Sequence, residues 1–579
     1  MTTQFFRLGV ASARRRVVMA VLAAFFLASL AVDRVAAEEV SSSIRLNTVG
    51  YPLRAQKIAS IAAPCTNFAV VRVPGGAMVL QGTVTGPVSD PDTQEQLYLA
   101  DFSKLEQPGD YQLDVPGVGR SAPFHVEKDI YREPFYVVMR GFYLWRCGTA
   151  VRATYQGMTF AHDICHTNDG WLDFVGGGHL QKDGTKGWHD AGDYNKYTVN
   201  AGVTVGVMFR AWEDFGPQIK AIRLDLPESG GPLPDFLAEI KWELDWLLTM
   251  QAPDGSVYHK LSTKWFGDFI PPESETAERY FTPWGSEATA DFVGILAQAA
   301  RIYRPYDPVF ADRCRQAARK SYRFLQAHPE YHPADQTGFH TGAYEINEPN
   351  RRLNGVPENR LWAAAEIWET TGDPGALRDL ENRIRSVHGK VDGDFDWDEV
   401  KDLGLLTYLF SERPGRDKTL VALVRSNLLA AANGIVQTAN HDAYARPLGS
   451  VYYWGCNGGV ARQAVILMAA DHITHRNIFH PSSKRVYRNT CLDALDHLFG
   501  RNYYGRSFVT GLGFNPPQHP HDRRDTGIYL NHPWPGYLVG GANPKATDWH
   551  DEQANYRVNE IAINWNSALV YALAAGLND

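Results

Sequence analysis

The feature that most constrains the fold is a change of hydrophobic periodicity at Tyr131. From there to the C-terminus, apolar residues recur at helical spacing in separate segments. About ten to twelve helices of ordinary length fit into this part of the chain, joined by long irregular loops. The pattern predicts an all-α barrel of helical hairpins with a site built from loops at one end. The clearest segments are 240–250, 292–303, 361–368, 420–432, 460–470 and 563–577.

Residues 44–127 have a different hydrophobic pattern, with short apolar runs separated by turn signals such as Pro74-Gly75-Gly76. This spacing predicts a small antiparallel β-sandwich of immunoglobulin-like size. A chain of 579 residues exceeds what one core usually organises. We therefore expect a multidomain protein, with the sandwich at 44–127 followed by a helical domain at 131–579. The expected strands are 57–63, 68–73, 78–84, 96–101, 110–115 and 123–127.

The N-terminus has the layout of an export signal. Three arginines at 14–16 precede the apolar run 17–32, and small residues at 35–37 offer a cleavage site. We expect a signal peptide at 1–37 and a secreted or periplasmic protein, with twin-arginine export hinted at by the arginine run. An uncleaved anchor is the alternative, although the run is slightly short for a span. With no later apolar segment of about 20 residues apparent, no membrane association is expected after cleavage.

The segment 187–195 is the strongest candidate for an active site. It carries Asp190 and Asp193 in a glycine-containing turn, with Trp188 and Tyr194 beside them. Paired carboxylates among aromatic rings suit hydrolysis of a glycosidic bond. The same spacing also occurs in ordinary turns and helix caps, which is the alternative. The net charge of -8 disfavours nucleic acid as a partner.

Two further blocks lie near the C-terminus. Glu560 directly precedes the helical run 563–577, where a carboxylate ordinarily stabilises a helix N-terminus. The loop 515–523 contains three prolines and resists regular structure. It is expected to present His521 and Arg523 as hydrogen-bond donors to a polar ligand.

Four residues could hold a metal ion. Cys147, Cys165, His166 and His189 offer two thiolates and two imidazoles, a closed tetrahedral set for zinc. A disulfide between Cys147 and Cys165 is an equal alternative on spacing alone. The wide scatter of the six cysteines argues against a dense disulfide framework.

Taken together, these blocks resemble glycoside hydrolase family 9, whose members are mostly β-1,4-glucanases. The block 190–193 is similar to the family's Asp-Ala-Gly-Asp signature, and Asn559-Glu560 is similar to its acid motif. Residues 44–51 look like the start of the immunoglobulin-like module that precedes many of its catalytic domains. The segments 457–458, 500–502 and 515–523 fit as well.

The resemblance implies an (α/α)6 barrel and an inverting mechanism. Glu560 would be the general acid and Asp193 the general base, with Asp190 helping to hold the attacking water. Inversion requires roughly 6.5–9.5 Å between the acid and the base, and a protonated acid at the working pH. The implied substrate-binding residues are His521, Arg523, Trp397, Trp454 and Trp565.

The resemblance also bears on metals. Family members with this N-terminal module hold a structural zinc at the segment that resembles 143–148, which favours zinc over a disulfide. Calcium is common in the family, and the loop 228–231 with Asp235 and Glu239 offers oxygen ligands for it. The chain departs from the family pattern at Asp522, usually His, at Trp565, usually Tyr, and at Asn555, usually Asp. These departures leave the sugar preference open.

The sequence therefore predicts a secreted, monomeric, inverting endo-β-1,4-glucanase acting on soluble or amorphous β-1,4-linked glucan. One alternative is an exo-acting relative that releases glucose, cellobiose or glucosamine. Another is a catalytically silent carbohydrate-binding protein. A zinc hydrolase is a third, although the open-site pattern His-Glu-x-x-His is absent.

Overall fold

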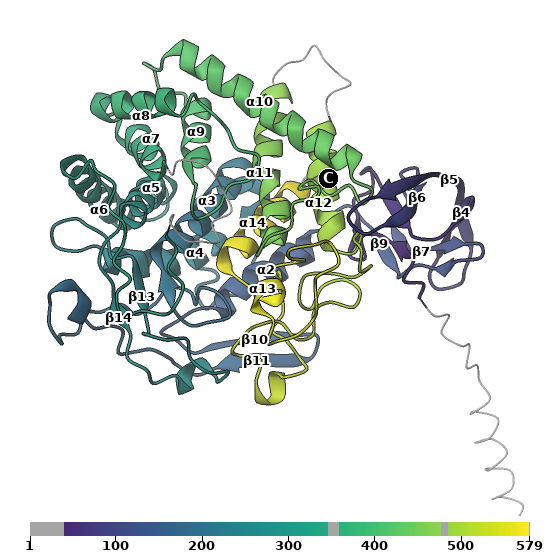
Figure 1. The fold of residues 1–579 in the computed structure, drawn as a ribbon, viewed down its shortest axis with the longest axis horizontal. Helices are drawn as coiled ribbons and strands as arrows, with labels where there is room; N and C mark the ends of the chain where they lie inside the picture. The colour runs from purple at the N-terminus through teal and green to yellow at the C-terminus, as the bar shows by residue number, and fades with distance from the viewer. Residues whose placement is uncertain (1–39, 346–357, 476–484, 578–579) are drawn as a thin grey trace, which may run out of the picture.

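The computed structural model describes residues 40–345, 358–475 and 485–577. The predicted signal peptide at 1–37 lies outside these ranges. The described chain forms a β-domain beside a larger helical domain (Figure 1).

The β-domain is a sheet in the order β1-β3-β6-β5-β4-β7-β9-β2, with β8 paired to β7. All pairs are antiparallel except β2 with β9, which is parallel. The expected strands form close to their predicted ranges, because turn residues separate the apolar runs. The strands are β1 Ile44–Arg45, β2 Gly50–Tyr51, β3 Ile58–Ile61, β4 Asn67–Arg72, β5 Met78–Asp90, β6 Glu95–Asp101, β7 Gly109–Val115, β8 Gly119–Arg120 and β9 Phe124–Val126.

Strand β5 runs six residues beyond its expected end at 84 and belongs to both faces of the sandwich. Its first half pairs with β4 and its second half pairs with β6. The register shifts between Thr85 and Val88, so a bulge absorbs Gly86 and Pro87. A Cβ at Gly86 would lie 2.8 Å from the carbonyl oxygen of Leu97, so the close approach requires glycine.

The helical domain is a barrel with inner and outer helices. The inner helices α14, α3, α5, α7 and α9 contact one another in that order, and α11 packs on α14. Together with the β-domain, this confirms the predicted sandwich followed by an (α/α)6 barrel. The inner helices are α3 Thr198–Lys220, α5 Ser286–Ile302, α7 Asn359–Thr371, α9 Lys401–Phe410, α11 Cys456–His475 and α14 Ile563–Gly576; the others are α2 Arg132–Leu144, α4 Asp235–Leu247, α6 Pro308–Ala327, α8 Pro374–Ser386, α10 Lys418–His441, α12 Val486–Leu498 and the short α13 Tyr556–Asn559.

Trp362 on α7 packs among the inner helices α3, α5 and α9 and is fully buried. Glycines on α3 and α5 make room for its indole, and a glycine on α9 lets that helix approach its backbone. A Cβ at Gly206, Gly294 or Gly404 would lie 2.7–2.9 Å from atoms of Trp362. Close packing of this kind fixes the relative positions of the inner helices, and therefore of the loops that precede them.

The long loops expected between the helices contain two small sheets that the sequence did not predict. A hairpin forms from β10 Val151–Tyr155 and β11 Met158–His162. Its turn at Gln156 and Gly157 has φ of 47° and 82°, which suits a two-residue hairpin connection. A small sheet joins β12 Lys196–Tyr197, β13 Lys260–Ser262 and β14 Tyr280–Phe281. Both sheets lie in the loops at one end of the barrel.

Helix α10 is long and apolar enough to cross a membrane by length and composition alone. The sequence predicted a helix at 420–432 but no apolar segment of this length. In the structure α10 packs against α11 and α12 (Figure 1). One apolar stripe of the helix, from Leu420 to Ala439, is buried against these helices, whereas Leu423 on another face is exposed.

Buried polar contacts join the two domains. The Asn47 side-chain amide donates to the Asp496 carboxylate at 2.9 Å and to the Tyr131 hydroxyl at 3.1 Å. Its carbonyl oxygen accepts from the backbone of Val49 and Gly50. Burial raises the pKa of Asp496 to about 8, so its interaction with a neutral amide needs no counter-charge.

Replacing Asn47 should destabilise the protein through this interface. In Asn47→Ala, Asp496 and two backbone amides lose their buried partner, which costs about 2–4 kcal/mol of unfolding free energy. A lower urea midpoint and a lower melting temperature would report it. Asn67→Ala, at an exposed position in β4, is the control and should change stability by less than about 0.5 kcal/mol. Equal stability of the two variants would contradict the prediction.

Candidate active site

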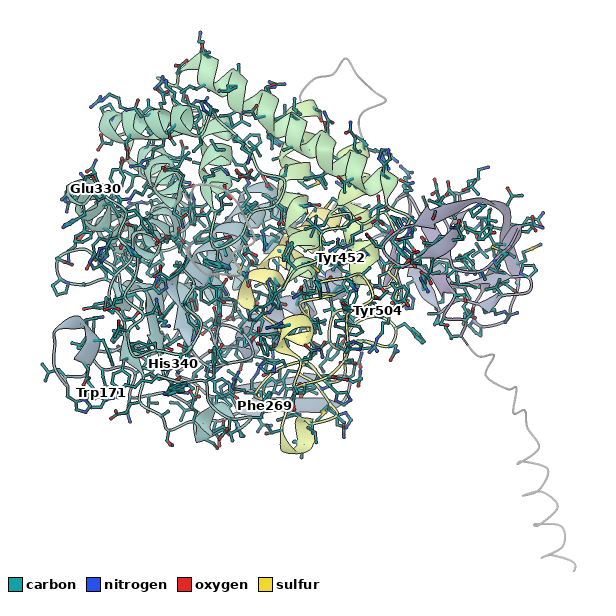
Figure 2. The ribbon with its side chains drawn as sticks, viewed as in Figure 1. Trp171, Phe269, Glu330, His340, Tyr452 and Tyr504 are labelled. Atoms are coloured by element: carbon teal, nitrogen blue, oxygen red, sulfur yellow. The ribbon has the colours of Figure 1, made fainter. Side chains whose placement is uncertain are left out.

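The predicted site residues lie in loops that precede inner helices. Asp190 and Asp193 come before α3, Trp397 before α9, Trp454 before α11 and Glu560 before α14. Inner helices of a hairpin barrel run in the same direction, so their N-termini meet at one end. Phe269 and His340, labelled in Figure 2, lie low in that view, among the loops of this end. Helix N-termini carry partial positive charge, which favours carboxylates there.

Backbone hydrogen bonds interlock the segments that carry the carboxyl groups. The amide of Arg523 donates to the carbonyl of Gly192 at 3.0 Å, and the amide of His521 donates to the carbonyl of Asn559 at 2.8 Å. The amide of Ile563 donates to the carbonyl of Asp190 at 2.9 Å. A Cβ at Gly192 would lie 2.2 Å from the His521 oxygen, so only glycine allows this approach. The segment that carries Glu560 and the loop that carries Asp190 and Asp193, the aspartate loop, are thereby held together.

Asp190 is fully buried, and its two carboxylate oxygens have separate donors. The Asn200 amide donates to one and the Tyr344 hydroxyl donates to the other, each at 2.8 Å. Burial raises the pKa of Asp190 well above its usual range, and the charge of Asp193 adds to the rise. The two hydrogen bonds oppose that rise and fix the orientation of the carboxyl group.

Asp193 has neighbours that favour its ionised form more than those of Asp190 do. Burial raises its pKa, but the Arg523 guanidinium and a hydrogen bond from Asn195 oppose the rise. The Asn195 amide donates to Asp193 Oδ2 at 2.7 Å, and the Tyr197 hydroxyl donates to the same oxygen at 3.2 Å. Asp193 therefore ionises more easily than Asp190.

Glu560 follows the short helix α13 and is partly buried. Burial raises its pKa well above the usual range, and the charge of Asp193 adds to the rise. Arg523 opposes it. The three carboxyl groups thus interact electrostatically, and the chain holds one of them, Asp193, closer to its ordinary acidity than the other two.

The four predicted metal ligands come together. Their ligand atoms all lie within 4.8 Å of one another. Cys147 Sγ is 3.5 Å from His166 Nδ1, and Cys165 Sγ is 3.8 Å from His189 Nε2. A tetrahedral zinc would separate sulfur and nitrogen ligands by about 3.6 Å, close to both values. Both cysteines are free thiols in this structure.

The chemistry of this cluster also suits a metal. Burial raises the pKa of Cys147, but hydrogen bonding with Cys165 and the charge of Lys196 outweigh it, so the net pKa falls well below the usual range. A thiolate is therefore favoured at Cys147, whereas the same hydrogen bond raises the pKa of Cys165. His166 Nε2 lies 3.2 Å from the Glu275 carboxylate, the arrangement that orients a metal-binding imidazole.

The predicted calcium loop does not fit a cation. Glu228 and Glu239 both pair with Arg146, at 2.9 Å each, and Glu239 is fully buried. Glu239 also accepts from the Trp188 indole at 2.9 Å. Asp235 accepts from a nearby backbone amide and a serine hydroxyl. A guanidinium supplies the positive charge here, so the calcium expectation is corrected to a buried ion-pair network.

His521 and Arg523 lie beside the carboxyl groups. The His521 ring hydrogen-bonds the Gln553 carbonyl through Nδ1 at 2.7 Å, which leaves Nε2 for a ligand. Arg523 Nε donates to the Gly267 carbonyl at 2.9 Å. The intervening Asp522, a departure from the family pattern, forms a buried pair with Arg524 at 2.6 Å. Asp522 is therefore committed to the protein interior.

The predicted sugar-stacking rings differ in position. Trp454 is 44% exposed and lies against Tyr556, with 5.2 Å between ring centroids. Trp397 is partly buried against Tyr344, which itself binds Asp190. Trp565 is only 7% exposed and covers two glycines of the 455–458 turn, so we assign it a packing role and correct its expected sugar contact.

Sequence reasoning missed Tyr344 and Asn200, the two donors to Asp190. Asn200 lies on the first turns of α3, where its proximity to the aspartate loop was a usable signal. Tyr344 lies 154 positions from Asp190 and carries no local signal. Only the closed barrel brings it there.

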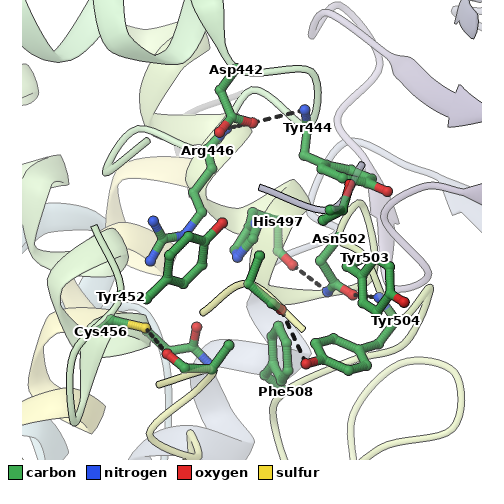
Figure 3. A pocket seen from close by; sticks show the side chains of 14 residues that line it. Asp442, Tyr444, Arg446, Tyr452, Cys456, His497, Asn502, Tyr503, Tyr504 and Phe508 are labelled. Atoms are coloured by element: carbon green, nitrogen blue, oxygen red, sulfur yellow. Dashed lines mark hydrogen bonds between the residues drawn. The ribbon is translucent and has the colours of Figure 1, made fainter. Parts of the chain in front are cut away.

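A separate small cavity lies between the β-domain turn at Thr93 and the barrel (Figure 3). Its volume is about 20 Å³, enough for a water molecule. Asp442, Arg446 and His497 are among its lining residues, and none of the predicted catalytic residues is. It is therefore part of the domain interface.

Comparisons with known proteins agree with this geometry. The family model described as Glycosyl hydrolase family 9 matches residues 131–573, and the Cellulase N-terminal ig-like domain matches residues 39–120. Endoglucanase D of Acetivibrio thermocellus is 52% identical over 542 residues, covering 93% of this chain and 84% of that protein. A metagenome-derived glycoside hydrolase family 9 endoglucanase aligns with a TM-score of 0.84 and 31% identity, covering 93% and 99% of the two chains. A Zn-binding triple mutant of the family 9 endoglucanase J30 aligns with a TM-score of 0.82 and 32% identity, covering 91% and 100%.

Proposed function

Because the chain belongs to glycosyl hydrolase family 9 and is an endo-1,4-β-glucanase, we propose that it cuts β-1,4-linked glucan by an inverting mechanism. Glu560 protonates the leaving oxygen as the general acid. Asp193 activates a water on the opposite face of the sugar as the general base. Asp190, fixed by Asn200 and Tyr344, orients that water.

One observation carries this proposal: the three interacting carboxyl groups have different surroundings, which shift their pKa values to different extents. The pKa of Glu560 is raised well above its usual range by burial and by Asp193, which favours a protonated acid. Arg523 and Asn195 counter the effect of burial on Asp193, which favours an ionised base. Groups whose surroundings push their pKa values apart can divide the acid and base roles between them.

His521 and Arg523 are proposed to bind sugar hydroxyls beside the cleaved bond, and Trp454 and Trp397 to stack on neighbouring sugar rings. Trp454 is the better candidate, because nearly half of its surface is open. The substrate is expected to be a soluble or amorphous β-glucan. The enzyme would encounter it outside the cytoplasm, after export directed by the segment 1–37.

We also propose a structural zinc ion held by Cys147, Cys165, His166 and His189. When bound, it would supply a rigid cross-link with four protein ligands and no open position. His189 is directly followed by Asp190, so the bound ion would hold the turn that carries Asp190 in a fixed position. The aspartates then meet the substrate in one orientation.

Product stereochemistry tests the proposed function. Hydrolysis of cellopentaose followed by proton NMR from the first minutes should show the α-anomer before mutarotation equilibrates it, because inversion at a β-linked carbon gives an α product. The β-anomer appearing first would rule out inversion. A lone small product from a soluble polymer would indicate exo action instead.

Removing the acid should abolish most turnover and change the pH dependence. Glu560→Gln should lower kcat about 10²–10⁴-fold. In the native enzyme, activity should fall as pH rises through the elevated pKa of Glu560, and fall at low pH as Asp193 protonates. The charged or titratable groups that face Glu560 are Asp190, Asp193, His521, Arg523 and Tyr344.

The variant's residual activity should lack the alkaline limb of this profile. Glu552→Gln, at an exposed position on the preceding segment, is the matched control and should keep both limbs. An alkaline limb that survives in Glu560→Gln would remove Glu560 from the acid role.

Metal analysis tests the zinc proposal. The purified protein should contain about one zinc per chain. Cys147→Ala and Cys165→Ala should each lose it and melt several degrees lower, since a metal that binds only the folded state stabilises that state. Cys65→Ala, in the β-domain, should retain zinc. Full zinc content in both cluster variants would place the metal elsewhere.

A further inference from the structure

Glu275 lies between the Cys/His cluster and the proposed sugar contacts, and orienting the His166 ring accounts for only one of its two carboxylate oxygens. Its side chain is 6% exposed, and one oxygen lies 3.2 Å from His166 Nε2. The other nitrogen of that ring, Nδ1, faces Cys147 at 3.5 Å. His166 therefore joins the cluster on one side to Glu275 on the other. A carboxylate in this position fixes the orientation of the imidazole.

The second oxygen of Glu275 packs against the backbone at Gly267. A Cβ at Gly267 would lie 2.4 Å from Glu275 Oε1, so any side chain at 267 would displace this oxygen. The carbonyl of Gly267 accepts from Arg523 Nε at 2.9 Å. The amide of Arg523 in turn donates to the carbonyl of Gly192, in the aspartate loop. An unbroken series of contacts thus runs from the cluster to the aspartate loop.

Ring contacts and polar contacts together hold the segment around Gly267. Trp265 stacks on His340 with 3.5 Å between ring centroids, and Phe269 meets His521 edge-on at 5.1 Å. Phe266 and Phe269 flank the Arg523 guanidinium, yet they are 47% and 37% exposed, and Trp265 is 63% exposed. With its aromatic rings this exposed, the segment depends in part on polar contacts for its position, such as the 2.6 Å hydrogen bond from the Tyr194 hydroxyl to the Ile270 carbonyl.

We propose that Glu275 is a positioning residue that transmits the geometry of the Cys/His cluster through Gly267 to Arg523. The proposal rests on the assignment of Arg523 as a substrate contact. The cluster would then have two roles. It would fix the turn at His189, and it would also fix the segment around Gly267 that contacts Arg523. A role confined to metal retention is the competing explanation.

Three variants separate these explanations. Glu275→Ala removes both contacts, whereas Glu275→Gln keeps an oxygen that can accept from His166 and a similar shape. Glu273→Ala, two positions away and exposed, is the matched control. Each is prepared with zinc and its zinc content measured. We expect Glu275→Ala to retain zinc and to lose about 10–100-fold in kcat/KM on cellohexaose. Glu275→Gln should recover most of the loss, and Glu273→Ala should match the native enzyme.

Hydrogen exchange gives a readout that does not need activity. In zinc-loaded Glu275→Ala, amides of 264–272 should exchange faster than in the native protein, as they should in native protein stripped of zinc. Unchanged exchange would overturn the proposal, even if the native enzyme failed to cleave glucan. Inactivity of the native enzyme on every β-glucan would instead count against the proposed function alone.

A double-mutant cycle tests the path itself. Arg523→Lys keeps the charge but removes the bond to the Gly267 carbonyl. If Glu275 acts through Arg523, adding Glu275→Ala to that variant should cost little more in kcat/KM. Fully additive losses would overturn the path through Gly267. Loss of zinc from Glu275→Ala, with activity restored by added zinc, would also overturn it and assign Glu275 to metal retention.

Discussion

The site depends on a backbone interlock among segments that are remote in sequence. Gly192 receives a hydrogen bond from Arg523, Asn559 receives one from His521, and Asp190 receives one from Ile563. Because these bonds use main-chain atoms, they fix the positions of the carboxyl-bearing residues before any side chain is considered. Gly192 is the tightest point, since any Cβ there would collide with the His521 carbonyl. The rigid inner ring around Trp362 supplies the frame on which this interlock closes.

Electrostatic interactions then give different pKa values to the carboxyl groups that the backbone brings together. Burial alone would raise every carboxyl pKa at this end of the barrel. Arg523 acts on both Asp193 and Glu560, but Asp193 also has the Asn195 amide at 2.7 Å. Glu560 has the negative Asp193 nearby, which works in the opposite direction. One arginine and one amide thus help to keep the pKa of Asp193 less raised than that of Glu560.

The sequence predicted elements where local chemistry decides them. Strands of the β-domain follow turn residues, and inner helices such as α14 follow apolar periodicity, so both were found. Contacts made only by closure of the barrel left no local trace: the Tyr344 hydroxyl on Asp190 is one, and the Arg146 guanidinium between Glu228 and Glu239 is another. The second case led to a calcium expectation, because two carboxylates in a loop look alike whether their partner is a metal ion or an arginine.

The Cys/His cluster joins a poorly buried loop to a well-buried turn. Between α2 and α3 the chain makes a hairpin, a short 3-10 helix and irregular loops, and residues 163–183 are mostly exposed or half-buried, whereas the turn at Trp188 belongs to the core. Packing alone therefore leaves the loop 163–183 weakly attached to the turn that carries Asp190. Four ligands from 147, 165, 166 and 189 would tie this loop to the turn at His189, next to that aspartate. A closed ligand set suits this role, because an open coordination position would add chemistry where only rigidity is needed.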